Sequence, residues 1–256
     1  MLTTILQGES SAQPPLLIAH GLFGSARNWG AIAKRLSVGR QVISVDMRNH
    51  GTSPRRPTQG YDGMAGDLSE VINLHGGRAD VLGHSMGGKA AMVLALTRPK
   101  LIERLIVADI APVAYSHSQS ALIRAMRGLD LEGLTSRVEA DRRLAATVDD
   151  PATRAFLLQS LDLRDEPPHW RLNLDVLEAE MSRLVGWPGV SGQFQGRALF
   201  VTGAQSSYVD DDGRARIAAL FPAAEFHQIE GAGHWLHAEK PREFEAAVAA
   251  FLERGG

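Results

Sequence analysis

A serine flanked by glycines directly follows a run of apolar residues in the segment VLGHSMGGKA, residues 81–90. Gly83, Ser85 and Gly87 form the pattern GxSxG. A chain that passes from a strand into a helix through one residue holds that residue on a strained turn, where its side chain is exposed and only small neighbours fit. Because ADVL precedes the pattern and the helical run KAAMVLALTRP follows it, we predict that Ser85 is a nucleophile. The alternative is a small residue in a tight turn.

A serine nucleophile needs a base, a group that orients the base, and N–H donors for the negative charge that develops on the substrate oxygen. The donors are considered first. The segment IAHGLFGSARNW, residues 18–29, places an HGxxG loop at the end of an apolar strand. In a hydrolase this loop lies beside the nucleophile, so the backbone N–H groups of Leu22 and Met86 would form the oxyanion hole. We expect His20 to brace this loop. The alternative is an ordinary glycine-rich loop.

The base must be chosen from nine histidines. His234 lies in the glycine-rich segment IEGAGHWLHAEKP, residues 229–241, after the last predicted strand and before the C-terminal helix. A nucleophilic serine early in the chain and a histidine late in it is the order expected of this architecture. We therefore predict that His234 is the base and that His237 is structural. The two histidines also suggest metal ligation, but no third ligand follows at a suitable spacing, and we predict no metal.

The orienting acid has two candidate positions. The loop VTGAQSSYVDDD, residues 201–212, has Ser206 where a carboxylate would be expected. Asp109 ends the apolar run RLIVAD and would approach His234 from a neighbouring strand, so we predict that Asp109 is the acid. Its alternative is the polar end of a buried strand. The rival acids resemble the first turn of a helix, where carboxylates favour the macrodipole; they are Asp210, Asp211 and Asp212. Ser206 would then hydrogen-bond to the acid or to the base.

Short apolar runs that alternate with helical patterns position these residues and predict an α/β fold with a mostly parallel sheet. Ligands of such sheets gather at the carboxyl ends of the strands. An antiparallel edge strand is predicted over residues 2–7. The candidate buried strands are residues 16–20, 41–46, 79–84, 104–109, 198–203 and 225–230.

Strand patterns disappear between Pro112 and Gly192, where helical patterns replace them. We predict a helical cap over residues 112–192, inserted into a core made of residues 1–111 and 193–256. Asp150 followed by Pro151 is typical of a helix start. The apolar lining of the cap has three aromatic candidates, with packing between cap helices as their alternative: Phe156, Trp170 and Trp187.

Composition limits the function classes for this chain of 256 residues with a net charge of −2. Lysine and arginine are scattered, which gives no indication of a nucleic-acid or anionic-membrane partner. The chain contains no cysteine, which excludes disulfides and a cysteine nucleophile. No apolar stretch approaches a membrane span and no signal peptide is evident, so we expect a cytoplasmic protein. We expect no cofactor, and the oligomeric state stays open.

Five segments in order resemble the α/β-hydrolase superfamily and, within it, the YbfF-type bacterial esterases and their ABHD11-like relatives. They are HGLFGSARNW, DMRNHGTSP, GHSMGGKAAM, VADIAPV and GAGHWLHAEKP. The resemblance implies a serine esterase with nucleophile Ser85, base His234 and acid Asp109. It also implies that Ser206 joins the acid and the histidine, although GAQSSYV departs from the loop that relatives tend to have. From DMRNHGTSP we expect Asp46, Arg48 and His50 to brace loops near the site.

The resulting hypothesis is hydrolysis of small-molecule carboxylic esters or acyl thioesters, with short-to-medium acyl groups and acyl-CoA among the candidates. Perhydrolysis of the cofactor-free haloperoxidase type, amide hydrolysis and acyl transfer use the same groups and stay open. Epoxide hydrolases and dehalogenases of this fold need an aspartate in place of Ser85. A rival from another class is a non-catalytic ligand receptor on a hydrolase scaffold. The physiological substrate stays open.

Overall fold

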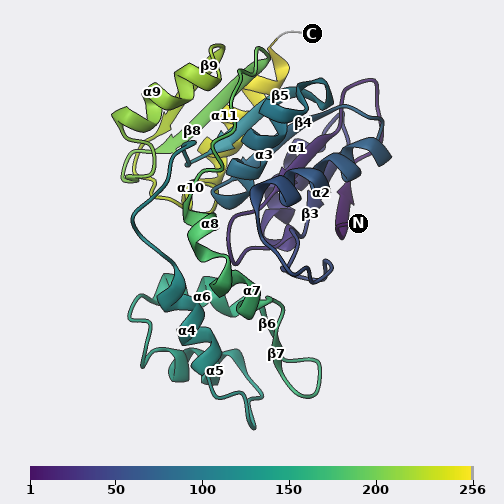
Figure 1. The fold of residues 1–256 in the computed structure, drawn as a ribbon. Coiled ribbons are helices and arrows are strands. Elements are labelled where there is room, and N and C mark those ends of the chain that lie inside the picture. The colour runs from purple at the N-terminus through teal and green to yellow at the C-terminus, as the bar shows by residue number, and fades with distance from the viewer. Residues whose placement is uncertain (255–256) are drawn as a thin grey trace.

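A seven-stranded, mostly parallel sheet forms the centre of the computed structural model, which describes residues 1–254 (Figure 1). Its strands are β1 Thr4–Gln7, β2 Leu16–Ala19, β3 Val42–Val45, β4 Ala79–His84, β5 Ile102–Ala108, β8 Arg197–Gly203 and β9 Ala224–Ile229. They lie in the order β1-β3-β2-β4-β5-β8-β9, and only β1 runs antiparallel to its neighbour. The predicted α/β class, the parallel sheet and the antiparallel edge strand are confirmed.

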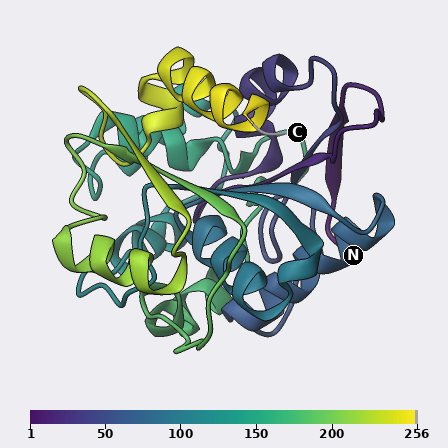
Figure 2. The ribbon, with the colours of Figure 1, turned by 90° about the horizontal axis from the view of Figure 1, so that it is seen from above.

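Helices cover both faces of the sheet (Figure 2). On one face lie α1 Gly30–Leu36 and α11 Pro241–Glu253; on the other lie α2 Tyr61–Leu74, α3 Met86–Thr97 and α9 Asp211–Leu220. Alternate strand residues face the two layers, so Leu105 and Val107 join one apolar core while Ile106 and Ala108 join the other. The shorter helices of this part are the 3₁₀ turns Ala26–Trp29 and Pro99–Leu101 and α10 Leu236–Glu239.

The strand predicted over residues 225–230 is present but not buried. β9 pairs only with β8, and its residues Phe226, His227 and Gln228 are exposed. The prediction of a buried strand was wrong here because β9 is an edge of the sheet, and an edge strand leaves part of its surface in water.

Residues 112–192, here called the inserted segment, form a layer of short helices at the carboxyl end of the sheet (Figure 1). The helices are α4 Ser120–Gly128, α5 Arg137–Leu144, α6 Pro151–Leu158, α7 Leu174–Ala179 and α8 Met181–Val185. The predicted start at Asp150 is confirmed, since its carboxylate accepts a hydrogen bond from the Thr153 N–H at 2.8 Å.

A small hairpin in the inserted segment was not predicted. It pairs β6 Leu161–Asp162 with β7 His169–Trp170. Strands of two residues are too short to show a period in the sequence, so the expectation that strands are absent here was wrong. Beyond the hairpin, Asn173 donates its N–H to the Asn49 carbonyl at 2.9 Å and so connects the segment to the core.

Within the part of the chain described, no helix is long and apolar enough to cross a membrane.

Candidate active site

Ser85 occupies a strained turn between β4 and α3. Its φ of 52° and ψ of −117° lie in a region that L-residues rarely adopt. The flanking glycines make the turn possible: a Cβ on Gly83 would overlap the Gly87 carbonyl, and one on Gly87 would overlap the Ala19 carbonyl. The predicted strand–turn–helix is therefore present, and it presents the Ser85 side chain to a cavity.

Sheet register brings the predicted acid next to the serine. His84 on β4 pairs with Ala108 on β5, and Ala108 pairs with Val201 on β8. Ser85 and Asp109 are the next residues of two neighbouring parallel strands and therefore leave the sheet at the same level. Asp109 also has a positive φ of 51°, which re-aims its side chain at the end of the strand.

His234 lies between these two side chains. Its Nε2 is 3.0 Å from Ser85 Oγ, and its Nδ1 is 2.7 Å from Asp109 Oδ2. Because the carboxylate accepts from Nδ1, Nε2 is left to accept the serine proton. The buried His84 donates from Nε2 to the His234 carbonyl at 2.9 Å and so fixes the loop that carries His234.

The rival acids take other positions. Asp210 is the N-cap of α9, where its carboxylate accepts the Gly213 N–H at 2.8 Å. Asp211 and Asp212 lie in the first turn of that helix, as its sequence pattern suggests. Among residues 1–254, the carboxylate that contacts His234 is that of Asp109.

Ser206 contacts the acid rather than the base. Its hydroxyl donates to Asp109 Oδ2, the oxygen that also faces His234. Its oxygen accepts the N–H of Tyr208 at 3.3 Å, and the Gly203 N–H donates to Asp109 Oδ1 at 3.1 Å. The loop after β8 therefore holds both oxygens of a carboxylate that comes from β5.

The two predicted oxyanion donors, Leu22 and Met86, both line the cavity beside Ser85. Within residues 1–254, neither backbone N–H donates to a protein acceptor. Met86 is the first residue of α3, where the helix dipole also favours negative charge. Two free amides at this position are suited to binding an oxyanion.

Two buried histidines hold the loop that carries Leu22. His20 Nε2 accepts the Met47 N–H at 2.9 Å, and His50 Nε2 accepts the Phe23 N–H at 3.2 Å. Asp46 Oδ1 accepts the Ala26 N–H at 2.8 Å, which fixes the same loop further along. These contacts give His20, Asp46 and His50 the bracing positions expected from the sequence.

Arg48, the third residue expected to brace a loop, pairs with Asp67 of α2. Its guanidinium donates to the Asp67 carboxylate at 2.6 and 2.9 Å and to the Gly63 carbonyl at 2.9 Å. Arg48 therefore ties the turn after β3 to α2.

Burial keeps several of these histidines neutral. Desolvation lowers the pKa of His50 and of His237 to about 3 and also lowers that of His20. Desolvation, together with the nearby His237 and His234, holds the pKa of His84 well below its usual value. His237 stacks on Trp29 with ring centroids 4.3 Å apart, which fits its predicted structural role.

A cavity of about 350 Å³ opens between the sheet and the inserted segment. Its apolar walls include Leu22, Ile110, Leu122, Phe156, Met181 and Leu184. Phe156 packs against Trp235, next to His234, with centroids 5.4 Å apart. Of the three aromatic candidates, Trp170 and Trp187 do not line this cavity; Trp170 instead donates its indole N–H to the Met126 carbonyl at 2.8 Å.

The sequence interpretation missed an aromatic cluster beside the base. Tyr208 stacks on His234 with ring centroids 3.8 Å apart and an interplanar angle of 15°. Tyr115 donates its hydroxyl to the Tyr208 carbonyl at 2.7 Å, and the rings of Tyr115 and His117 lie near that of Tyr208. An aromatic residue two positions after Ser206 was the available signal, but nothing local indicated that it would reach the histidine.

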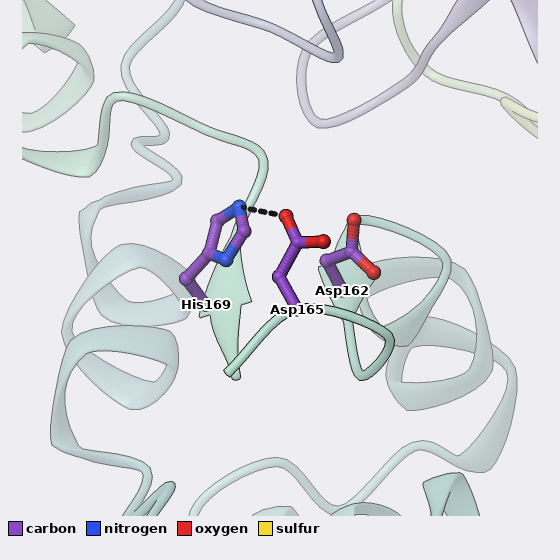
Figure 3. Close-up of side chains that lie close together, drawn as sticks. All are labelled: Asp162, Asp165 and His169. Atoms are coloured by element: carbon purple, nitrogen blue, oxygen red, sulfur yellow. Dashed lines mark ion pairs between the residues drawn. The ribbon is translucent and has the colours of Figure 1, made fainter. Parts of the chain in front are cut away.

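One side-chain group among the described residues has the ligand types of a metal site: Asp162, Asp165 and His169, near the β6–β7 hairpin (Figure 3). His169 Nε2 lies 3.9 Å from Asp165 Oδ2, and both side chains are exposed. The buried Asp162 already pairs with Arg171, and hydrogen bonds from the Arg164 N–H and from Arg171 lower its pKa to about 2. None of the three lines the cavity at Ser85, and we assign no metal to them.

Comparison with known proteins identifies the family of the chain. Residues 14–241 match the model of the alpha/beta hydrolase fold. The chain is 39% identical over 256 residues to the sn-1-specific diacylglycerol lipase ABHD11 of Danio rerio, covering 96% of this chain and 80% of that protein. It is 37% identical over 240 residues to esterase YbfF of Escherichia coli K12, covering 93% and 92%.

A solved structure, described as a marine microorganism esterase, superposes with a TM-score of 0.93 at 36% identity and covers 98% of both chains. The family model matches most of the chain, two relatives are more than one third identical to it, and the solved structure has the same fold. All three findings support the same assignment. The chain belongs to the α/β-hydrolase family, and within it to the group that contains esterase YbfF and ABHD11.

Proposed function

We propose that this protein is a serine esterase that hydrolyses small carboxylic esters or acyl thioesters through an acyl-enzyme on Ser85. The observation that carries the proposal is the line of contacts from Ser85 through His234 to Asp109, at 3.0 and 2.7 Å, beside two free backbone amides. The relatives that are named esterases and a lipase support ester hydrolysis by this family.

The first half of the reaction acylates the serine. His234 Nε2 takes the proton of Ser85 while Oγ attacks the acyl carbon, and the carbonyl π electrons move to the oxygen. The N–H groups of Leu22 and Met86 stabilise that oxyanion. The oxyanion then collapses, the bond to the leaving alcohol or thiol breaks, and His234 gives that group the proton.

The second half returns the enzyme to its resting state. His234 takes a proton from water as its oxygen attacks the acyl carbon, and the carbonyl π electrons move again to the oxygen. This oxyanion collapses, the bond from the acyl carbon to Ser85 Oγ breaks, the carboxylic acid leaves, and Oγ regains the proton from His234. Asp109 holds the imidazole orientation and stabilises its positive charge in both halves. Ser206 positions Asp109 by donating to the oxygen that faces His234.

The acyl group would occupy the cavity beside Ser85. A volume of about 350 Å³ is at the small end of ligand pockets, which supports short-to-medium acyl chains. Because α4, α6 and α8 contribute Leu122, Phe156 and Leu184 to its wall, we propose that residues 112–192 act as a cap on the core of residues 1–111 and 193–256.

Replacement of the nucleophile tests the proposal. We expect Ser85→Ala to lower kcat for p-nitrophenyl acetate and butyrate by at least about four orders of magnitude, since a triad without its nucleophile retains only binding and oxyanion stabilisation. A fluorophosphonate probe should label the wild type and leave Ser85→Ala unlabelled. Ser10→Ala, at an exposed position, is the matched control and should keep both properties.

Two outcomes would redirect the proposal. Turnover retained by folded Ser85→Ala would refute the serine mechanism, and a folded wild type that resists the probe would favour a ligand receptor. The substrate class is decided by a panel of acyl esters, matched amides and acyl-CoA thioesters of increasing length, each run beside Ser85→Ala. Faster turnover of the amide than of the matched ester would identify an amide hydrolase instead.

A further inference from the structure

Lys89 is a buried cation that the proposed reaction does not use. It lies one helical turn after the nucleophile, where its N–H donates to the Ser85 carbonyl at 3.0 Å. The residue is only 1% exposed. Burial lowers the pKa of its ammonium to about 7, so its charge is costly to keep in this position. A buried lysine is kept charged only where hydrogen-bond acceptors compensate for the lost water.

Three carbonyl oxygens accept from the Lys89 ammonium. Nζ lies 2.8 Å from the Val113 oxygen, 3.1 Å from the Val185 oxygen and 2.6 Å from the Gly186 oxygen. An ammonium has three N–H donors and a neutral amine has two, so these contacts use the full capacity of the charged form. No donor is left to bind a substrate, although the side chain lies along the cavity.

The chain passes twice between the core and the inserted segment (Figure 1). The three acceptors belong to these two connections. Val113 belongs to the outgoing connection, residues 109–119, between β5 and α4. Val185 ends α8, and Gly186 begins the return connection toward β8, residues 186–196. Lys89 therefore holds both connections from a single point on the helix that begins after Ser85.

Neighbouring contacts join the two connections around Lys89. Tyr115 donates its N–H to the Val185 carbonyl at 2.9 Å, and its ring centroid lies 4.6 Å from Nζ. Tyr61 of α2 donates its hydroxyl to the Leu184 carbonyl at 2.6 Å, and its ring centroid lies 5.7 Å from Nζ. Two aromatic faces and three carbonyls thus surround the charge.

We propose that Lys89 is a positioning residue that fixes the inserted segment over Ser85 by holding both of its connections, and so sets which acyl chains the cavity accepts. This inference rests on the proposed function only for its effect on substrates. The cavity wall includes Tyr115 within the outgoing connection, Leu122 just beyond it, and Met181 and Leu184 before the return connection. Loosening both connections would therefore move both sides of the wall relative to Ser85.

The test replaces Lys89 by methionine, which is unbranched and one atom shorter and removes every side-chain donor. Hydrogen–deuterium exchange is compared for wild type, Lys89→Met, Lys89→Arg and the exposed control Lys100→Met. In Lys89→Met we expect amide exchange in residues 113–117 and 184–188 to be about tenfold faster. This is the effect of losing about one charge-assisted hydrogen bond at each connection. β4 and β5 should keep wild-type exchange.

The kinetic arm uses p-nitrophenyl esters from acetate to octanoate. In Lys89→Met we expect KM to rise about tenfold for the longer chains, with a smaller change in kcat, so that the preference among chain lengths flattens. Lys89→Arg keeps the charge and several donors and should fall between wild type and Lys89→Met. Lys100→Met should match the wild type in both arms.

Unchanged exchange at both connections would overturn the proposal. Exchange in β4 and β5 that increases as much as exchange at the connections would also overturn it, because Lys89 would then stabilise the whole fold. If Lys89→Met does not fold, Lys89→Arg decides by the same criteria. The exchange experiment does not depend on turnover. The role of Lys89 can therefore be tested even if Ser85→Ala shows that the serine mechanism is wrong. Thermal stability is a poor readout, because removal of a buried ammonium also removes its desolvation cost.

Discussion

The carboxylate of Asp109 accepts hydrogen bonds from three residues: Gly203, Ser206 and His234. The side chain that these bonds hold has no exposure to water. One oxygen is held by the Gly203 backbone and the other by a hydroxyl and an imidazole. An acid held in this way cannot turn away from His234 without losing several bonds, so the tautomer of the base is fixed as well.

Substitutions at the acid, its partner and the rival acid should therefore differ in effect. We expect Asp109→Asn to lower kcat by about 10⁴, because an amide nitrogen facing Nδ1 reverses the tautomer of His234. Ser206→Ala should lower kcat about tenfold, the scale of one hydrogen bond. Asp210→Asn should keep activity and stability, since asparagine is an equally good N-cap.

Steady-state kinetics with p-nitrophenyl butyrate, supported by circular dichroism, would check this ranking. A larger loss in Asp210→Asn than in Asp109→Asn would move the acid to the loop after β8. An unchanged kcat in Ser206→Ala would restrict that serine to a structural role.

At the scale of elements, the turn from β4 to α3 depends on how closely α3 approaches β2. A Cβ on Gly87 would overlap the carbonyl of Ala19 at the end of β2, so the helix start and the strand cannot separate without moving Ser85. In contrast, Gly66 within α2 has open space around its Cβ position. The same substitution should therefore have opposite effects in the two helices.

We expect Gly87→Ala to lower the free energy of unfolding by about 1–3 kcal/mol, the usual cost of overpacking, and to lower activity with it. Gly66→Ala is the matched control and should raise stability by up to about 1 kcal/mol, the difference in helix propensity. Urea unfolding checks both. A Gly87→Ala variant as stable as the wild type would contradict the close approach of α3 to β2.

The elements that sequence patterns predicted best are those with long apolar runs. β4 and β8 are buried along their length, so their runs are nearly continuous and their ends are marked by His84 and Gly203. The β6–β7 hairpin could not be predicted in this way because its two-residue strands are too short to show a period. The exposure of β9 could not be predicted because its position at the edge depends on how the whole sheet is ordered.

At the scale of the whole molecule, buried neutral histidines couple stability to pH. Burial lowers the pKa of His50 and His237 to about 3, below the ordinary value of 6.5 that an unfolded chain would have. Between these two values the unfolded state binds more protons than the folded state. The contribution of these two histidines to stability is therefore complete above about pH 6.5 and decreases as the pH falls through that window.

We expect the free energy of unfolding to fall as the pH drops below 6.5, each such histidine contributing up to about 1.4 kcal/mol per pH unit. Urea unfolding from pH 7.5 to pH 4.5 measures this slope. His237→Gln should make the slope shallower, whereas His227→Gln, at an exposed position, should leave it unchanged. Equal slopes in the two variants would contradict a neutral, buried His237.

The sequence by itself determined the residues that local pattern and chain order control. GxSxG between a strand and a helix defined the turn at Ser85, and a glycine-rich loop after the last strand indicated His234. The HGxxG loop indicated Leu22 in the same way. The structure places these residues side by side because strained turns restrict residue type locally, and because parallel strands bring their carboxyl ends to one edge.

Only the tertiary structure decided the contacts between distant segments. It placed Ser206 on Asp109 rather than on His234, stacked Tyr208 on the imidazole, and brought three carbonyls to Lys89. It also showed that Phe156, and neither Trp170 nor Trp187, lines the cavity. These choices depend on sheet register and on how the inserted segment packs against the core, and such packing leaves no periodic signal in the residues that it joins.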